Sequence, residues 1–177
     1  MLSWLLVIIL SYLFFSLAFF GDKLILAGPP NPKLYAFYVG ALSLLMVFFI
    51  PFAPFGLPSA TATVWIILEA VVYIAGLYVM FLALEKFDVS RVMTTIGATQ
   101  PIAILLLTWL FFGFYPMTWM HGLAFLLLCA GSVMISLEKK FKITTGYVVL
   151  ILGSSLLFSL DYIFSKLVFE NEPFLQG

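Results

Sequence analysis

Two carboxylate side chains, those of Glu69 and Asp161, interrupt long apolar stretches of this 177-residue chain. A charged side chain is costly inside a bilayer, so one that lies within a membrane span indicates a functional site by default. Such a carboxylate can bind a proton, a cation or a polar substrate. The structural alternative is that each carboxylate hydrogen-bonds to a neighbouring helix or reaches water. Both interpretations stay open from the residues alone.

Other polar residues recur at spacings that place them on one face of a helix. Tyr73 follows Glu69 by one helical turn, and Gln100 directly precedes Pro101. A proline in mid-helix frees a backbone carbonyl, which is tolerated in a membrane where it lines a cavity or finds another donor. Polar faces of this kind either line a cavity or pack helices closely. The candidate residues for substrate or proton binding are Glu69, Tyr73, Gln100, Asp161, Ser16, Ser159 and Tyr162.

An internal repeat places two lysines at equivalent positions. Residues 11–24 recur as residues 154–167, with seven of 14 positions identical, where about one match is expected by chance. Lys23 and Lys166 correspond in this alignment. Each lysine either extends to a lipid headgroup region or lies at one mouth of a pathway, so both are candidate pathway-mouth residues.

Several classes of function are excluded by composition. The net charge is zero, with eight basic and eight acidic residues, so no basic footprint for nucleic acid is present. One histidine and one cysteine, Cys129, leave most metal sites and catalytic arrangements without the residues that they need. We therefore expect no enzyme, no metal, no cofactor and no disulfide within the chain. The sequence assigns no oligomeric state.

The elements that must position these residues are membrane helices. The chain is 64% hydrophobic and 9% charged, and about 20 apolar residues suffice to cross the hydrocarbon layer. Gly, Pro and short charged clusters separate the apolar stretches, and Ser59 or Thr61 can cap the third helix. The sequence therefore predicts an all-α polytopic helical bundle with six spans, at residues 2–20, 34–52, 61–84, 89–112, 118–137 and 145–169.

The basic residues predict an orientation in the membrane. Seven of the eight Lys and Arg residues lie in or beside the connections between spans one and two, three and four, and five and six. Cytoplasmic connections carry an excess of Lys and Arg. We therefore expect a multi-pass protein of the cell membrane with its N-terminus outside.

The repeat also predicts a domain organisation. Five spans separate the start of the first copy from the start of the second, and an odd number inverts the second copy relative to the first. The predicted divisions are a five-helix repeat at residues 1–137, a basic linker at 138–144, and the incomplete start of a second repeat at 145–177.

The segment from 83 to 135 resembles the EamA-type members of the drug/metabolite transporter superfamily. The resemblance rests on a degenerate set of features: Ala83-Leu84 before a short turn, Val89-Ser90-Arg91-Val92 at a helix start, Pro101 in mid-helix, Leu110 to Gly113, and Gly122 and Gly131. One position departs from it, because Phe114 follows Gly113 where the family often has Glu. The resemblance implies two inverted five-helix repeats, and hence that this chain holds six of ten spans.

The leading hypothesis is a secondary transporter or exporter that moves small metabolites, amino acids or drugs across the cell membrane by alternating access, as the resemblance implies. Its partners would be a small-molecule substrate and the lipid bilayer, with proton coupling through one carboxylate. A lipid-linked sugar flippase and a membrane scaffold without transport activity are the alternatives. A membrane enzyme acting on lipid would need a nucleophile with a base or a metal cluster, and the sequence has neither.

Overall fold

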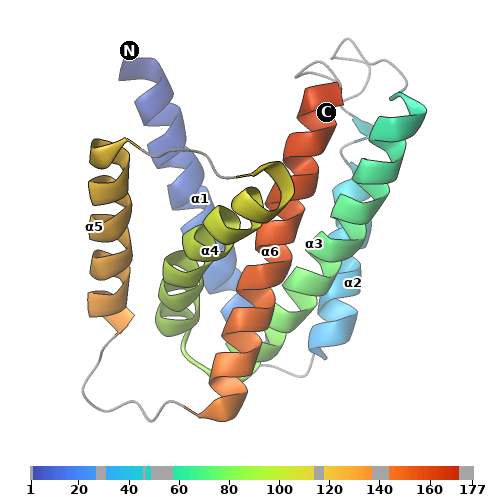
Figure 1. Cartoon of the computed structure of the whole chain (residues 1–177). Helices are drawn as coiled ribbons and strands as arrows, with labels where there is room; N and C mark the ends of the chain where they lie inside the picture. The colour runs from blue at the N-terminus through green and yellow to red at the C-terminus, as the bar shows by residue number, and fades with distance from the viewer. Residues whose placement is uncertain are drawn as a thin grey trace.

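All regular structure in the described residues is helical. The computed structural model describes residues 2–26, 31–45, 47–48, 58–113, 118–136 and 144–171. Within these ranges the helices are α1 (Leu2–Leu26), α2 (Pro32–Ser43), α3 (Ala60–Lys86), α4 (Val89–Phe112), α5 (Trp119–Ser136) and α6 (Thr145–Asn171). Each helix overlaps one predicted apolar segment, which confirms the all-α prediction (Figure 1). Two bounds differ from the prediction: α1 continues to Leu26 instead of ending at residue 20, and α2 ends at Ser43 instead of residue 52.

Local signals explain where the helices begin and end. The Ser59 hydroxyl accepts a 3.2 Å hydrogen bond from the Ala62 amide, so Ser59 is the N-cap of α3. Asn31 caps α2 through the Lys33 amide at 2.9 Å, and Pro32 occupies the first helical position. At the end of α4, Gly113 has a φ of 82°, a backbone conformation that glycine adopts readily.

Four of the described helices are long and apolar enough to cross a membrane: Leu5–Leu26 of α1, Ala60–Lys86, Val89–Phe112 and Thr145–Asn171. The apolar stretch of α5, Trp119–Gly131, is shorter than these four. The predicted second span at 34–52 and the predicted linker at 138–144 lie partly outside the described residues. The chain therefore has the helices of a membrane protein, and the number of six spans stays a prediction.

The central helix of the bundle is α6. It packs against α3 on one side and α4 on the other, while α2 covers α3, α5 covers α4, and α1 contacts α3 and α4 (Figure 1). The α3–α6 contact is close because Gly76 of α3 and Gly153 of α6 present no side chain there. The repeated segments 11–24 and 154–167 lie in α1 and α6, which run in opposite directions (Figure 1).

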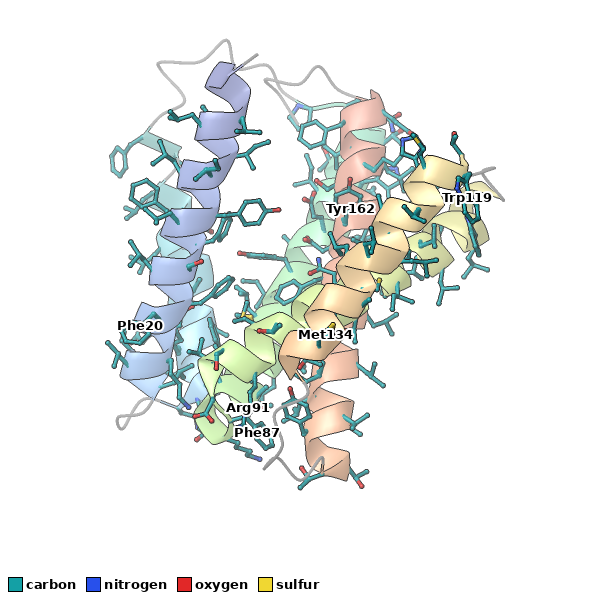
Figure 2. The ribbon with its side chains drawn as sticks, turned by 90° about the vertical axis from the view of Figure 1, so that its left-hand side faces the viewer. Phe20, Phe87, Arg91, Trp119, Met134 and Tyr162 are labelled. Carbon is teal, nitrogen blue, oxygen red and sulfur yellow. The ribbon has the colours of Figure 1, made fainter. Side chains whose placement is uncertain are left out.

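The hydrophobic core lies at the end of the bundle where α1, α3 and α5 end and α2, α4 and α6 begin (Figure 1). We call the connections from α1 to α2, α3 to α4 and α5 to α6 the odd-numbered connections. Leu77, Met80, Phe81 and Leu84 near the end of α3 pack there with residues from the first turns of α4 and α6: Val92, Ile96, Tyr147 and Ile151. Phe87 and Arg91 lie at this same end, whereas Tyr162 lies in the opposite half of the bundle (Figure 2). The short charged connection between α3 and α4 thus lies at the same end of the molecule as the core.

Candidate functional site

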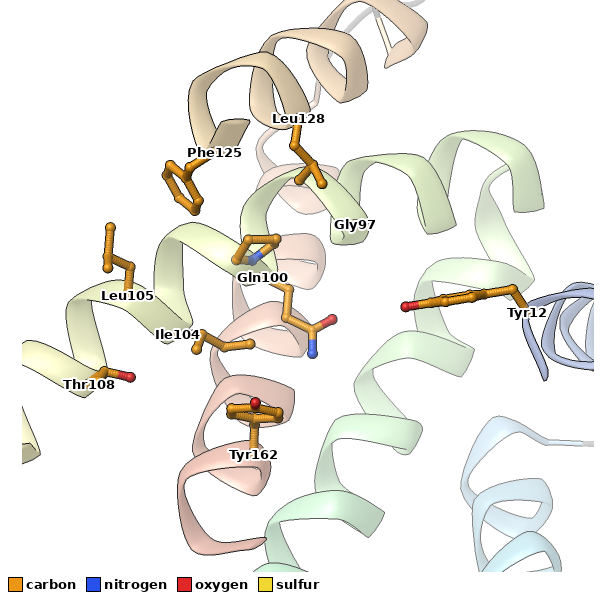
Figure 3. Close-up of a pocket in the computed structure, with 10 residues that line it drawn as sticks. Tyr12, Gly97, Gln100, Ile104, Leu105, Thr108, Phe125, Leu128 and Tyr162 are labelled. Carbon is orange, nitrogen blue, oxygen red and sulfur yellow. The ribbon is translucent and has the colours of Figure 1, made fainter. Parts of the chain in front are cut away.

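A cavity of about 730 Å³ lies between α1, α4, α5 and α6. The Gln100 side chain projects from α4 into the space between Tyr12 of α1 and Tyr162 of α6, and Phe125 of α5 bounds the cavity on another side (Figure 3). The structure therefore brings together two residues of the predicted set, Gln100 and Tyr162, which come from different helices.

A second cavity of about 400 Å³ adjoins the first and extends it toward α3 and the core. Tyr12, Gly97 and Gln100 line both cavities, and Tyr73 of α3 and Phe158 of α6 are added in the second. We call the two together the Gln100 cavity. It includes three residues of the predicted site, Gln100, Tyr73 and Tyr162.

Pro101 removes one helical hydrogen bond beside this cavity. A proline nitrogen carries no hydrogen, so Pro101 cannot donate to the carbonyl of Gly97, four residues earlier. Gly97 lines both parts of the Gln100 cavity, and a Cβ added to it would meet no atom within 4 Å. The sequence predicts a carbonyl without its helical donor near Gln100. In the structure, the residue that carries this carbonyl, Gly97, lines the cavity.

The two carboxylates lie in a separate, neighbouring cavity. Glu69 of α3 and Asp161 of α6 line a space of about 320 Å³ together with Ile66, Ala70 and Tyr73. The two carboxylates thus border the same space, where α3 packs against α6. Across the described residues, no three His, Cys, Asp or Glu side chains gather closely enough to hold a metal ion. Tyr73 lines both this cavity and the Gln100 cavity, so it separates the two.

The two candidate serines use their hydroxyl groups within the helices. Ser16 is exposed and donates a 2.8 Å hydrogen bond to the Tyr12 carbonyl of its own helix. Ser159 is fully buried, and its single hydroxyl hydrogen is shared between the Ser155 carbonyl, at 2.6 Å, and the Gln100 carbonyl, at 3.2 Å. Ser159 therefore joins α6 to the backbone of α4 directly behind the Gln100 side chain, which positions Gln100.

The two candidate lysines lie at opposite ends of the bundle, and each has partners. The Lys23 ammonium donates to the carbonyls of Leu84 and Phe87 at the end of α3, the Phe87 bond being 3.0 Å long. A cation at a helix C-terminus satisfies carbonyls that lack helical donors and interacts favourably with the helix dipole. Lys166 pairs with Glu170 at 3.7 Å and lies 3.9 Å from the centre of the Phe112 ring.

Sequence reasoning found part of the cavity and missed the rest. Tyr12 carries a usable signal, because it precedes the candidate Ser16 by one turn of the same helix. Phe125 and Leu128 of α5 also line the cavity. They carry no such signal, since both are apolar residues within a uniformly apolar helix.

Comparisons with other proteins add no relative. No protein-family model, no characterised protein and no solved structure matches the chain.

Proposed function

We propose that this protein is a secondary transporter that carries a small solute across the cell membrane by alternating access, in the manner of the EamA-type transporters that it resembles. The observation that carries the proposal is the Gln100 cavity, an open space beside a polar amide that residues from four helices of a membrane bundle line. Small-solute sites are mostly apolar cavities with a few polar groups that orient the ligand. A scaffold needs no such cavity.

The position of the core supports alternating access. In α4, every buried residue, Val92, Ile96 and Ala98, precedes Gln100. The packed core therefore lies between the Gln100 cavity and the odd-numbered connections. A transporter closed on one side of its substrate site has this arrangement, and the opposite state would require the core end to separate.

Several finer features belong to the same proposal. The opposite directions of α1 and α6 support an inverted repeat with divisions at 1–137, 138–144 and 145–177. Lys33, Lys86 and Arg91 at the core end support a cytoplasmic location for that end and an external N-terminus. We call the cavity that Glu69 and Asp161 line the carboxylate cavity. It supports proton coupling, because the two carboxylates lie beside the Gln100 cavity without lining it.

Solute exchange in proteoliposomes tests the proposal. Three labelled solutes with a common phenyl group differ in charge: N-acetylphenylalanine amide is neutral, phenylalanine is zwitterionic and benzyltrimethylammonium is cationic. A transporter exchanges at least one of them saturably, and Gln100→Leu reduces that exchange. Rates equal to those of protein-free vesicles for all three solutes would support the scaffold. Protein-dependent movement of a labelled lipid-linked sugar, without solute exchange, would support the flippase.

A further inference from the structure

Aromatic side chains line part of the Gln100 cavity, and two of them are largely exposed. Tyr12 and Tyr162 are 71% and 55% exposed, although both line the cavity. On the α3 side, the rings of Tyr73 and Phe158 lie 6.1 Å apart and tilted by 57°. Aromatic rings pair favourably at centroid distances of about 4.5–7 Å in offset or edge-to-face geometry. The cavity therefore offers several faces and edges on which a flat apolar solute can pack.

The polar groups of the cavity are all uncharged. The Gln100 amide can donate and accept hydrogen bonds, as can the hydroxyls of Tyr12 and Tyr162. Gly97, whose carbonyl cannot accept a hydrogen bond from the Pro101 nitrogen, also lines the cavity. These groups match a solute that carries a neutral amide or a similar N–H or O–H donor.

Charged side chains are missing from the part of the Gln100 cavity wall that the structure describes. Among the described residues that line the two parts of the Gln100 cavity, none is Asp, Glu, Lys, Arg or His. Glu69 and Asp161 line the neighbouring cavity, with Tyr73 between the two spaces. An ionised group that enters a low-dielectric cavity without a partner of opposite charge loses its hydration without compensation. A zwitterionic amino acid would bring two such groups into the Gln100 cavity.

We propose that the Gln100 cavity selects an uncharged solute that combines a flat aromatic body with a neutral hydrogen-bond donor, and that it rejects amino acid zwitterions and organic cations. This inference rests on the transport function proposed above and narrows its substrate class. Gln100 is then the residue that recognises the donor, while Tyr12 and Tyr162 hold the aromatic body.

The test measures both binding to the full chain in lipid nanodiscs and exchange in proteoliposomes, with the three phenyl solutes named above. N-acetylphenylalanine amide is expected to bind and exchange at least tenfold better than phenylalanine or benzyltrimethylammonium. Gln100→Leu should weaken its binding by about tenfold or more, since the solute's amide then loses its partner. Gln100→Glu places a carboxylate in the same cavity and should shift the preference toward the ammonium solute.

A matched control comes from the same helix. Leu106 of α4 is 57% exposed and lines neither part of the cavity, so Leu106→Ala should leave the binding of all three solutes within about twofold of wild type. Equal elution of the variants on size exclusion verifies that they are folded.

The outcomes separate the substrate class from transport itself. Gln100-dependent exchange of phenylalanine or of the ammonium solute, equal to or above that of the neutral amide, would overturn the substrate class and leave the transporter standing. Binding of the neutral amide without exchange would keep the class and overturn transport. If no solute binds, the inference about substrate class is wrong.

Discussion

The Tyr35 phenol donates a 2.6 Å hydrogen bond to the Asp22 carboxylate and so ties α2 to the end of α1. The Tyr35 ring also lies 4.8 Å from the ring of Phe81 in the core. Next to Asp22, Lys23 binds the last carbonyls of α3. These contacts hold three helices together at the core end, and an opening of that end would have to break them.

Tyr35→Phe removes this hydrogen bond and retains the ring. We expect the free energy of unfolding to fall by about 1.5–3 kcal/mol, the usual range for a hydrogen bond to a charged group. Unfolding in mixed detergent micelles, followed by circular dichroism, measures the change. Tyr38→Phe is the control, because Tyr38 lies on the same helix with 54% of its surface exposed. Equal losses in the two variants would contradict a specific role for the Asp22 bond.

A second prediction concerns the α4–α6 contact, where the hydroxyls of Thr99 and Ser155 lie 2.5 Å apart. Thr99→Val and Ser155→Ala should be coupled in a double-mutant cycle by about 0.6 kcal/mol and by no more than about 1.7 kcal/mol, the range found for hydrogen bonds between membrane helices. Thr63 supplies the control, since its hydroxyl donates to the Ser59 carbonyl at 2.9 Å, next to the start of its own helix. Thr63→Val should be additive with Ser155→Ala, and a zero coupling for the test pair would refute the contact.

Two glycines at the α3–α6 contact should respond differently to alanine. A Cβ on Gly76 would lie 3.1 Å from the Phe158 ring, whereas a Cβ on Gly153 would lie 3.6 Å from Val79. We expect Gly76→Ala to lower the free energy of unfolding by about 1–3 kcal/mol through overpacking, and Gly153→Ala to be neutral or slightly stabilising. Because Phe158 also lines the Gln100 cavity, Gly76→Ala should weaken solute binding as well. Similar stabilities of the two variants would be inconsistent with this geometry.

A fourth prediction separates coupling from solute binding. Asp161 lines the carboxylate cavity and is absent from the wall of the Gln100 cavity. Asp161→Asn removes a carboxylate that can exchange a proton, so proton-driven accumulation in proteoliposomes should be lost, while solute exchange at equal pH and expression are kept. Glu170→Gln, on the same helix and paired with Lys166, is expected to leave accumulation intact. Undiminished accumulation in Asp161→Asn would remove this residue from the mechanism.

The orientation can be tested by cysteine labelling in a Cys129→Ser background. Lys33 and Thr118 are both exposed and belong to opposite ends of the bundle. If the odd-numbered connections are cytoplasmic, an impermeant maleimide added to intact cells should label Thr118→Cys and spare Lys33→Cys until the membrane is opened. The reverse pattern would place the N-terminus in the cytoplasm.

The helices themselves could be predicted from the sequence because helix formation is local. Backbone hydrogen bonds link residues four apart, and caps such as Ser59 act within one turn. The predicted segments at 61–84, 89–112 and 145–169 therefore differ from α3, α4 and α6 by no more than two residues at either end. Composition alone also determined that these helices suit a membrane.

The tertiary structure decided which side chains meet. Ser159 and Tyr162 were equal candidates on one helix, yet Ser159 is fully buried against α4 while Tyr162 is 55% exposed at the cavity. The sequence grouped Gln100 with Glu69 and Asp161, and the fold puts the carboxylates in a cavity of their own. The physical reason is that helices apolar on every side have no stripe that marks the buried face. Contacts between helices, such as the close approach of Gly76 to Phe158, determine that face.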